Sequence, residues 1–549
     1  MTDSLTIALA QLNPTVGDVD GNVARIAAAR TKALGADLLV GSELVVSGYP
    51  PEDLIYREAF LDAVEAGVTK LAALTADGGP ALLIGAPWRE KGVAHNAVLL
   101  LDAGKVAGVR FKHHLPNYGV FDEKRVFTSG PAPGPMVFRG VRLGAMICED
   151  MWFEDIAETL EESGAELLIV PNGSPFELDK PDTRINHAVA RVSETGLPLI
   201  YVNQVCGQDD LVFDGGSFVL NADRSLAVQM PWWREEIVLT TWTRQGKTWA
   251  CEPQKLTPAL DRLENIYQAM VLGLRDYVTK NRFPGVVLGL SGGIDSAISA
   301  AVAVDALGAE KVHCVMMPSP YTSQESLDDA ASCAKLLGIK LDSVSIKPAM
   351  DAYQSMLAPL FADAKADTTE ENLQSRARGM TLMALSNKFG KMVLSTGNKS
   401  EMSTGYATLY GDMCGGFCVL KDVYKTTVFA VSRWRNAHKP EGALGPSGPV
   451  MPENVIAKPP TAELKPDQKD QDTLPEYEVL DGILKGLIEG QLGIAAVTAK
   501  GYDEATVRRV YRMLKMAEYK RRQAAPGVKI THLAFGRDYR YPITNGFNG

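Results

Sequence analysis

Short apolar runs alternate with helical patterns along the first 250 residues of the chain. Runs such as "LTIALAQL", "ADLLVGSE", "ALLIGAPW", "VRLGAMICE", "ELLIVPNG" and "LPLIYVNQV" predict strands. Between several of them, as in "NVARIAAARTKALGA" and "FEDIAETLEESGA", apolar residues recur at helical spacing. This alternation predicts βαβ units and a sheet covered by helices. Because strands follow one another directly around residues 81–115, we expect a mixed sheet.

A second alternation of strands and helices begins after residue 260. The stretch "CEPQKLTPAL", residues 251–260, has the composition of a linker, and a long helical pattern follows it. Strand patterns start at Gly285 and recur in "KVHCVMMP", "LDSVSI" and "KMVLSTGN". We therefore expect two domains, residues 1–250 and 261–549, the second a doubly wound α/β domain. The stretch 439–475, rich in Pro, Gly, Lys and Asp, predicts a long mobile loop of the kind that is often functional.

The composition is that of an ordinary globular protein. The chain has 549 residues, a formal net charge of −10, 46% hydrophobic residues and 22% charged residues. This charge and the lack of a sustained Lys/Arg stripe argue against a nucleic-acid surface, and the apolar runs are too short to span a bilayer. The N-terminus lacks the basic segment of a secretion signal, and seven scattered cysteines fit reduced thiols. We expect a soluble cytoplasmic protein with no nucleic-acid or membrane partner.

The stretch "GLSGGIDS", Gly289 to Ser296, has the character of a phosphate-binding loop. Its glycines allow close backbone approach to phosphate oxygens, and the following helix adds its positive N-terminal end. The lysine of the common nucleotide loop is absent, and Asp295 stands where a cation is expected. An acid beside a triphosphate fits a ligand of Mg²⁺. A strand-to-helix turn capped by an aspartate is the alternative.

The loop "SGGIDS" resembles the pyrophosphate loop of the ATP-pyrophosphatase superfamily, enzymes that adenylate a substrate and release pyrophosphate. Three further segments resemble the NAD synthetases within it: "TEENLQSRARGM" (369–380), "LSTGNKSEMSTGYATLYGDMCGGF" (394–417) and "KPPTAELKPDQKDQDTLPEYEVLD" (458–481), the last like their mobile loop. The resemblance covers nearly all of residues 260–549 and implies an adenine nucleotide alpha hydrolase-like fold.

This resemblance also implies a set of site residues. They are Gly289, Leu290, Ser291, Gly292, Gly293, Ile294, Asp295, Ser296 and Thr396 for ATP, Asp295 and Glu401 for Mg²⁺, and Asn372, Glu401 and Lys520 for the substrate deamido-NAD⁺. Taken without the loop, Glu401 is better explained as an acid at a helix N-terminus. Lys520 is then better explained as a solvated member of the run "YKRR".

Three reactive side chains in the first half are predicted to lie near strand ends. Glu43 follows "ADLLVGS", Lys112 precedes "HHLP", and Cys148 lies in "GAMICEDMWF". A thiolate, a carboxylate base and a lysine suffice to hydrolyse an amide, because Glu43 would take the proton of Cys148 and Lys112 would stabilise thiolate and oxyanion. Taken singly, a buried structural cysteine, a surface glutamate and a solvated lysine are the commoner explanations.

These stretches resemble the Glu-Lys-Cys signatures of the nitrilase (carbon–nitrogen hydrolase) family: "SELVVSGY", "FKHHLP" and "ICED", in family order. The resemblance spans about residues 1–250, implies an α-β-β-α sandwich, and assigns the catalytic lysine to Lys112. It further implies an additional acid at Glu123 and glutamine contacts at Tyr118, Ser174 and Lys180.

Two other residue pairs invite a metal or redox role. The amide chemistry needs no histidine, and His113 with His114, having no third ligand nearby in the sequence, make a poor zinc signature. The segment "CGGFC", Cys414 to Cys418, lacks both the CxxC spacing and a partner pair. Packing of small residues explains it better.

Together the resemblances imply a glutamine-dependent ligase of the NAD synthetase family. Deamido-NAD⁺, ATP, L-glutamine and water would give NAD⁺, AMP, diphosphate and L-glutamate, through an adenylated substrate and ammonia passed along a shielded path. The resemblance implies Mg²⁺ as cofactor and a homo-oligomer formed through the second domain. Three rivals stay open: another glutamine-dependent ligase such as a GMP synthetase, a nitrilase or amidase regulated by nucleotide, and a non-catalytic assembly protein.

Overall fold

The computed structural model describes residues 3–246, 248–362, 364–466 and 468–547. The chain divides into two units, Met1–Leu260 and Asp261–Gly549. Each unit has its own sheets and its own hydrophobic clusters. Among the described helices, none is long and apolar enough to cross a membrane.

A seven-stranded sheet and a six-stranded sheet form the centre of the first unit. In sheet order, the first has β15 (Thr248–Cys251), β14 (Glu236–Gln245), β1 (Ser4–Gln11), β2 (Leu38–Val40), β3 (Ala81–Glu90), β4 (Val93–Asp102) and β5 (Lys105–Phe111). The second has β13 (Leu226–Gln229), β12 (Phe218–Leu220), β9 (Leu199–Val202), β8 (Leu167–Pro171), β7 (Val141–Ala145) and β6 (Met136–Phe138). Both sheets combine parallel and antiparallel pairs, which confirms the predicted mixed sheet.

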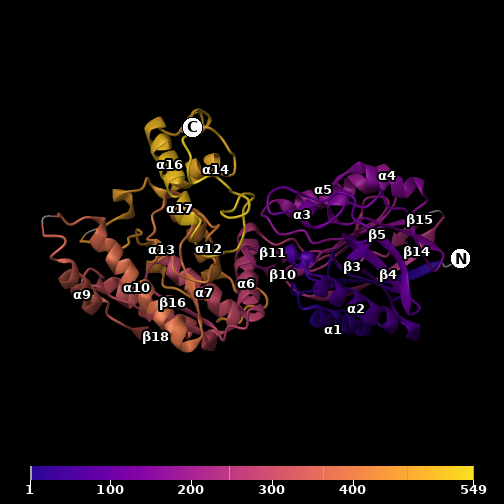
Figure 1. Ribbon diagram of the computed structural model, residues 1–549, viewed down its shortest axis with the longest axis horizontal. Helices are drawn as coiled ribbons and strands as arrows, with labels where there is room; N and C mark the ends of the chain where they lie inside the picture. The colour runs from indigo at the N-terminus through magenta and orange to yellow at the C-terminus, as the bar shows by residue number, and fades with distance from the viewer. Residues whose placement is uncertain (1–2, 247, 363, 467, 548–549) are drawn as a thin grey trace. The chain divides into compact units, whose positions relative to one another are not determined.

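Helices cover the outer face of each sheet. Helices α1 (Val19–Lys32) and α2 (Glu58–Leu74) pack on the first sheet, and α4 (Glu154–Glu162) and α5 (Lys180–Thr195) pack on the second (Figure 1). The layers therefore run helix, sheet, sheet, helix, which confirms the predicted α-β-β-α sandwich. A short hairpin of β10 (Val205–Gln208) and β11 (Leu211–Asp214) completes the unit.

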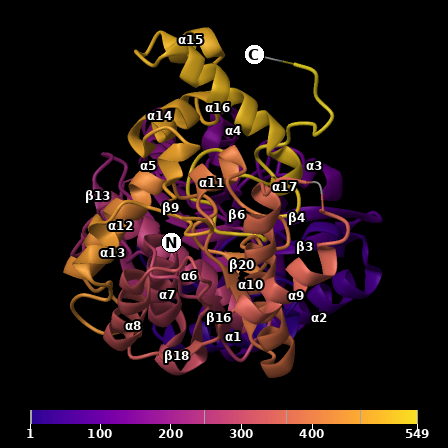
Figure 2. The same ribbon diagram turned by 90° about the vertical axis from the view of Figure 1, so that its left-hand side faces the viewer.

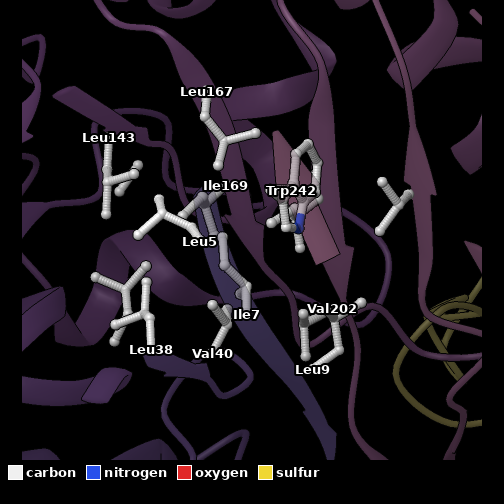
Figure 3. Packing of buried hydrophobic residues seen from close by; sticks show 14 of the residues in the cluster. Leu5, Ile7, Leu9, Leu38, Val40, Leu143, Leu167, Ile169, Val202 and Trp242 are labelled. Carbon is white, nitrogen blue, oxygen red and sulfur yellow. The ribbon is translucent and has the colours of Figure 1, made fainter. Parts of the chain in front are cut away.

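Strict alternation along the strands sorts side chains between two hydrophobic layers. In β1, Ile7 and Leu9 point into the layer between the sheets, whereas Ala8 and Ala10 join the cluster beneath α1 and α2. Figure 3 shows the inner layer, where Ile7 and Leu9 meet Val202 from the second sheet and Trp242. Because neighbouring positions in a strand face opposite sides, a one-residue slip would reverse both layers at once.

The segment expected to be a linker has no helix or strand after Cys251. It is nevertheless held by backbone hydrogen bonds, from Gln254 N to Ala227 O (2.8 Å) and from Thr257 N to Gln229 O (3.2 Å). Asp261 is the first residue of the second unit. Its carboxylate accepts hydrogen bonds from Leu263 N and Glu264 N and so caps α6 (Arg262–Lys280).

A five-stranded parallel sheet forms the centre of the second unit. Its order is β18 (Lys340–Ser343), β17 (Val312–Met316), β16 (Val286–Gly289), β19 (Met392–Ser395) and β20 (Phe417–Cys418). Sequential strands run outward from β16 in both directions, which confirms the predicted doubly wound topology and leaves the carboxyl ends of β16 and β19 side by side. In such sheets, ligands bind outside the carboxyl ends where the order reverses.

Helices of the second unit pack against this sheet. They are α6, α7 (Ile294–Leu307), α8 (Gln324–Leu337), α9 (Lys347–Leu357) and α10 (Thr368–Phe389), and α12 (Lys425–Ala437) packs in turn on α6 and α7. Helix α10 packs on β16 and β19 through a cluster that includes Val287, Val393 and Ala377, while α7 packs on β16 and β17 and contacts α6 and α12.

Helices from the last part of the chain pack with the earlier helix α11 (Lys399–Thr404) in a cluster within the second unit. The cluster comprises α11, α14 (Tyr477–Leu487), α15 (Ile494–Thr498), α16 (Glu504–Met516) and α17 (Glu518–Arg521). Figure 2 shows α14, α15 and α16 side by side in yellow. The predicted long loop 439–475 contains α13 (Glu453–Ala457) and a short 3-10 helix, η5 (Asp470–Asp472), and its Val450, Met451 and Asp470 are buried.

Candidate active sites

The three side chains expected to act together in the first unit are all buried close to one another. Glu43 follows β2, Lys112 follows β5, and Cys148 follows β7. The Lys112 ammonium lies 2.7 Å from Glu43 Oε1 and 2.8 Å from Glu123 Oε1, and neither Lys112 nor Glu43 is exposed to solvent. The additional acid expected at Glu123 is thus a direct partner of the lysine.

Neighbouring polar groups fix the orientation of both carboxylates. Asn96 Nδ2 donates to Glu43 Oε1 (2.7 Å), and the backbone N–H of Gly173 donates to Glu43 Oε2 (2.8 Å). Tyr49 OH donates to Glu123 Oε1 (2.8 Å). Each carboxylate oxygen that faces Lys112 therefore has a second donor, which holds the cluster in one geometry.

The thiol of Cys148 is aimed by a strained turn. Cys148 has φ 47°, in the left-handed region, and begins the 3-10 helix η3 (Cys148–Trp152) directly after a buried strand. Burial raises the pKa of the thiol, Glu43 raises it further, and Lys112 opposes both. The resting cysteine is therefore a thiol, and it would need a base to become a nucleophile.

The charges of the cluster are set by competition between burial and pairing. Burial alone would lower the pKa of Lys112, but Glu123 and Glu43 outweigh it, so the pKa lies well above the usual value. Burial raises the pKa of Glu123 to about 7, although Lys112 lowers it. The ammonium is thus permanent, whereas Glu123 can exchange a proton near neutral pH.

Asp150 is a buried positioning residue that sequence reasoning missed. Its carboxylate accepts hydrogen bonds from Ile147 N (3.0 Å), His113 N (3.1 Å) and His114 N (2.7 Å). One side chain thereby ties the backbone before Cys148 to the backbone after Lys112. No spacing in the sequence gives this contact, because the two segments follow strands of different sheets and meet only in the folded unit.

Two of the predicted glutamine contacts, Tyr118 and Lys180, interact with a further acid, Glu149, that the sequence did not single out. Tyr118 OH donates to both oxygens of Glu149 (2.9 and 3.0 Å). Lys180 acts electrostatically on the same carboxylate and lies 5.4 Å from the centre of the Phe121 ring. Glu149 is buried, its pKa is raised by burial, and it adjoins Cys148 in the chain. A buried acid in this position suits an ammonium group of a bound substrate.

Ser174 is held rigidly by a buried ion pair. Arg184 donates from Nε to Ser174 Oγ (3.1 Å), and from Nη2 to Ser174 O (2.8 Å) and Pro175 O (3.0 Å). Its Nη1 donates to both oxygens of Asp214 (2.8 and 2.9 Å). All five guanidinium donors are used inside the unit, so the Arg184–Asp214 pair fixes the loop that carries Ser174.

In the second unit, the phosphate loop joins β16 to α7. Ser291 Oγ and Ser296 Oγ lie 3.1 Å apart, and Ser291 Oγ accepts from Gly293 N (3.2 Å), which closes the loop on itself. Gly292 has φ 84°, and a Cβ there would lie 2.3 Å from Ser326 O. Only glycine fits this position, because the loop passes directly over the backbone of α8.

The predicted metal ligands Asp295 and Glu401 face each other across a lysine that the sequence did not reveal. Lys425 Nζ pairs with Asp295 Oδ2 and lies 3.5 Å from Glu401 Oε1, and Asn398 Nδ2 donates to Asp295 Oδ1 (3.0 Å). Burial and Asp295 raise the pKa of Glu401 while Lys425 lowers it, and the pKa is about 8 as a result. Two facing carboxylates are the oxygen ligands that Mg²⁺ prefers, so the donor set fits that ion.

A cavity of about 290 Å³ lies beside these groups, entirely within the second unit. Of the residues predicted to bind ATP or metal, its walls include Gly289, Leu290, Ser291, Gly293, Ile294, Asp295, Ser296, Thr396 and Glu401. Gly292 is placed in the loop without lining the cavity. Lys425, Arg378 and Asp470 line it as well and were not predicted from the sequence.

Asn372 and Lys520 are not among the residues that line this cavity. Both instead hold the segment 405–408: Lys520 Nζ donates to Gly405 O (2.7 Å) and Ala407 O (2.6 Å), and Asn372 Oδ1 accepts from Thr408 Oγ1 (2.9 Å). Their expected contact with the dinucleotide stays a prediction.

The segment resembling a mobile loop is packed on the start of α8. Glu463 accepts from Ser323 Oγ (2.7 Å) and Ser326 Oγ (2.9 Å), and Lys458 Nζ lies 2.7 Å from Asp329 Oδ2. Asp470 accepts from Tyr477 OH (2.7 Å) and raises the pKa of Glu401. The loop thereby contributes charged groups to the wall of the cavity.

The fold corrects one expectation about the histidine pair. Asp155, 41 residues after His114, lies 2.9 Å from His114 Nε2 through its Oδ1, so a third possible metal ligand is near. The segment around Cys414 and Cys418 gives no such group. Cys418 is buried with its Sγ 3.0 Å from Gly397 O, which agrees with the packing role expected for it.

Comparison with known proteins identifies both units. The carbon–nitrogen hydrolase family model matches residues 6–247, and the NAD synthase family model matches residues 266–524. The chain is 50% identical over 547 residues to a glutamine-dependent NAD(+) synthetase of Rhodobacter capsulatus, and 45% identical over 548 residues to that of Acinetobacter baylyi, each covering 99% of both chains. A solved structure of glutamine-dependent NAD⁺ synthetase from Acinetobacter baumannii in complex with ADP matches with a TM-score of 0.79, 43% identity and 99% coverage of both chains.

Proposed function

Because the chain belongs to the family of glutamine-dependent NAD(+) synthetases, we propose that it converts deamido-NAD⁺, ATP, L-glutamine and water to NAD⁺, AMP, diphosphate and L-glutamate. One observation carries this proposal. A buried Glu43–Lys112–Cys148 group occurs in one unit, and a phosphate loop facing two carboxylates occurs in the other, in a chain similar to these synthetases from end to end.

In the first unit, Cys148 is the nucleophile of glutamine hydrolysis. Glu43 removes the thiol proton as sulfur bonds to the amide carbon, and returns it to the leaving nitrogen, so that ammonia departs and a thioester remains. Water, deprotonated by Glu43, then cleaves the thioester to glutamate. The buried Lys112 ammonium stabilises the negative charge on the amide oxygen in both steps, where the low polarity strengthens its effect.

Glu149, Tyr118, Ser174 and Lys180 select glutamine. The Glu149 carboxylate suits the α-ammonium group, because it is buried and lies next to Cys148, and the Lys180 ammonium suits the α-carboxylate. Arg184 supports the pocket from behind through Ser174.

In the second unit, the carboxylate of deamido-NAD⁺ attacks the α-phosphorus of ATP, and pyrophosphate leaves. The backbone N–H groups of the phosphate loop and the start of α7 bind the departing pyrophosphate, and Lys425 neutralises charge beside it. Asp295 and Glu401 would hold Mg²⁺, which supplies charge neutralisation to the phosphate oxygens. Ammonia then attacks the acyl-adenylate, and AMP leaves as the amide forms.

The assembly and location of the protein are part of the same proposal. Large apolar side chains on α9 and α10 and the segment between them are exposed, among them Met356 (67%), Leu360 (78%) and Met380 (66%). Such a surface supports a homo-oligomer formed through the second unit. The proposed substrates, deamido-NAD⁺, ATP and glutamine, are metabolites of the cytoplasm, so we propose a cytoplasmic enzyme.

Pyrophosphate release by the purified protein with ATP, Mg²⁺ and glutamine, with and without deamido-NAD⁺, tests the function. We expect release only with deamido-NAD⁺ and NAD⁺ formed in equal amount. Hydrolysis of glutamine without pyrophosphate release would contradict the proposed acceptor.

A further inference from the structure

Three side chains of the first unit form a group that the proposed reaction does not use. His113 and His114 follow Lys112 in the chain, and Asp155 is the second residue of α4. One ligand atom from each of the three lies within 4.8 Å of the other two. Neither histidine contacts the Glu43–Lys112–Glu123 cluster through its ring, so the group is separate from the catalytic side chains in its chemistry.

The ring of His113 is oriented as metal-binding histidines are. Its Nδ1 lies 2.8 Å from Gly130 O, a carbonyl that can only accept, so Nδ1 carries the proton. The lone pair of the neutral ring is then on Nε2, on the far side from the carbonyl. A backbone carbonyl on one nitrogen and a metal on the other is the usual arrangement around a ligating histidine.

His114 and Asp155 already face one another. His114 Nε2 lies 2.9 and 3.1 Å from the two oxygens of Asp155, and the ring of His114 is tilted over that of Phe153 at 4.2 Å between centroids. The two histidine rings are perpendicular with 4.7 Å between their centroids, and one ligand atom of each lies within 4.8 Å of the other.

The backbone beneath this group is fixed. The buried carboxylate of Asp150 accepts from His113 N and His114 N, so the two histidines cannot shift independently of η3. The His114 and Asp155 side chains are 25% and 53% exposed, which gives an ion a path from solvent and leaves room for water as a further ligand.

We propose that His113, His114 and Asp155 bind a borderline divalent transition-metal ion such as Zn²⁺. Two imidazoles, one carboxylate and an open fourth position are a donor set for that class of ion, with bonds of about 2.0–2.2 Å. On binding, the side chains would rotate to bring the ligand atoms, now within 4.8 Å of one another, to such distances from the ion. Mg²⁺ would not compete, because it prefers an all-oxygen shell. The ion would tie the chain after Lys112 to α4, which follows Cys148.

Titration of the metal-free full-length protein with Co²⁺ in excess Mg²⁺ tests this site. We expect one Co²⁺ per chain, with the visible absorption of a tetrahedral nitrogen and oxygen site and no thiolate-to-cobalt band. The variants Asp155→Asn and His114→Gln should each weaken binding by about tenfold or more, since even indirect partners of a metal contribute about that much. Glu154→Gln, with the same charge change on the same exposed turn, should bind as the unmodified protein does.

Two results would overturn the proposal. One is unchanged Co²⁺ affinity in both Asp155→Asn and His114→Gln. The other is a thiolate-to-cobalt band that disappears in Cys148→Ser, which would place the ion on the catalytic cysteine. Since Asp155 is exposed, its variant should retain the far-ultraviolet circular dichroism and melting temperature of the unmodified protein, so that lost binding reports on the site.

Discussion

Replacing Asp214 by asparagine tests what the buried ion pair does for the proposed glutamine pocket. Both side chains of the pair are almost fully buried, 3% exposed for Arg184 and 1% for Asp214. The variant keeps the size of the side chain but leaves the guanidinium charge uncompensated in the interior. Removing one partner of a buried pair costs about 3–5 kcal/mol, so we expect the free energy of unfolding of the first unit to fall by this amount.

The same change should weaken glutamine use. Arg184 also holds Ser174 through three hydrogen bonds, two of them to the segment's carbonyls, so a shifted guanidinium displaces this predicted contact. Since a misplacement of about 1 Å can cost up to about 100-fold, we expect kcat/KM for glutamine to fall by at least about tenfold. Synthesis from ammonium should be unchanged.

Tryptophan fluorescence during urea unfolding reports mainly on the unfolding of the first unit. Six of the seven tryptophans lie in the first unit, at positions 88, 152, 232, 233, 242 and 249. Asp20→Asn, which breaks an exposed pair with Lys70 in the same unit, is the matched control and should cause no measurable loss.

A double variant, Arg184→Met with Asp214→Leu, separates the two effects. It removes both charges and should recover most of the stability, because apolar replacement of a buried pair is often neutral. It should not recover glutamine use, because Ser174 loses its donors. An Asp214→Asn protein with unmodified stability, or a double variant with unmodified kcat/KM, would refute this account.

Three further predictions concern the two sites. Cys148→Ala should abolish glutamine-driven NAD⁺ synthesis and spare synthesis from ammonium, whereas Asp295→Ala should abolish both and leave glutamine hydrolysis measurable; loss of both activities in a folded Cys148→Ala protein would contradict the division of labour. The raised pKa of Glu123 favours the folded state at low pH, so this contribution is full below its ordinary pKa of 4.5 and is lost as pH rises through about 7. Unfolding free energy measured against pH should therefore fall across this window in the unmodified protein more steeply than in Glu123→Gln, and parallel curves would be the contrary result. Gly292→Ala should abolish pyrophosphate release because its Cβ meets α8 backbone, while Gly493→Ala, with φ −72° and open space, should not; equal activity of the two variants would exclude the steric argument.

Most of the fold could be predicted from local patterns along the chain. Apolar runs such as that of β1 and the caps around α6 depend on neighbouring residues, and both could be read directly. The mixed first sheet was also predictable, because β3, β4 and β5 follow one another without helices. The residues near strand ends, Lys112 and Cys148, were placed for the same reason.

Contacts between distant segments could not be predicted in this way. Lys425 lies 130 positions from Asp295, and its sequence neighbourhood has no feature that indicates a buried ammonium between two acids. Asp150 and Glu149 had no signal beyond the cysteine beside them. Asp155 and His114 are 41 positions apart and meet only in the folded unit, so the third ligand was missed.

The hydrophobic clusters of the first unit and those of the second draw on separate stretches of chain. In evolutionary terms, each half can accept compensating core substitutions without adjustment in the other. Such a layout allows two folding units to be joined by a short segment, while each continues to vary under its own packing constraints.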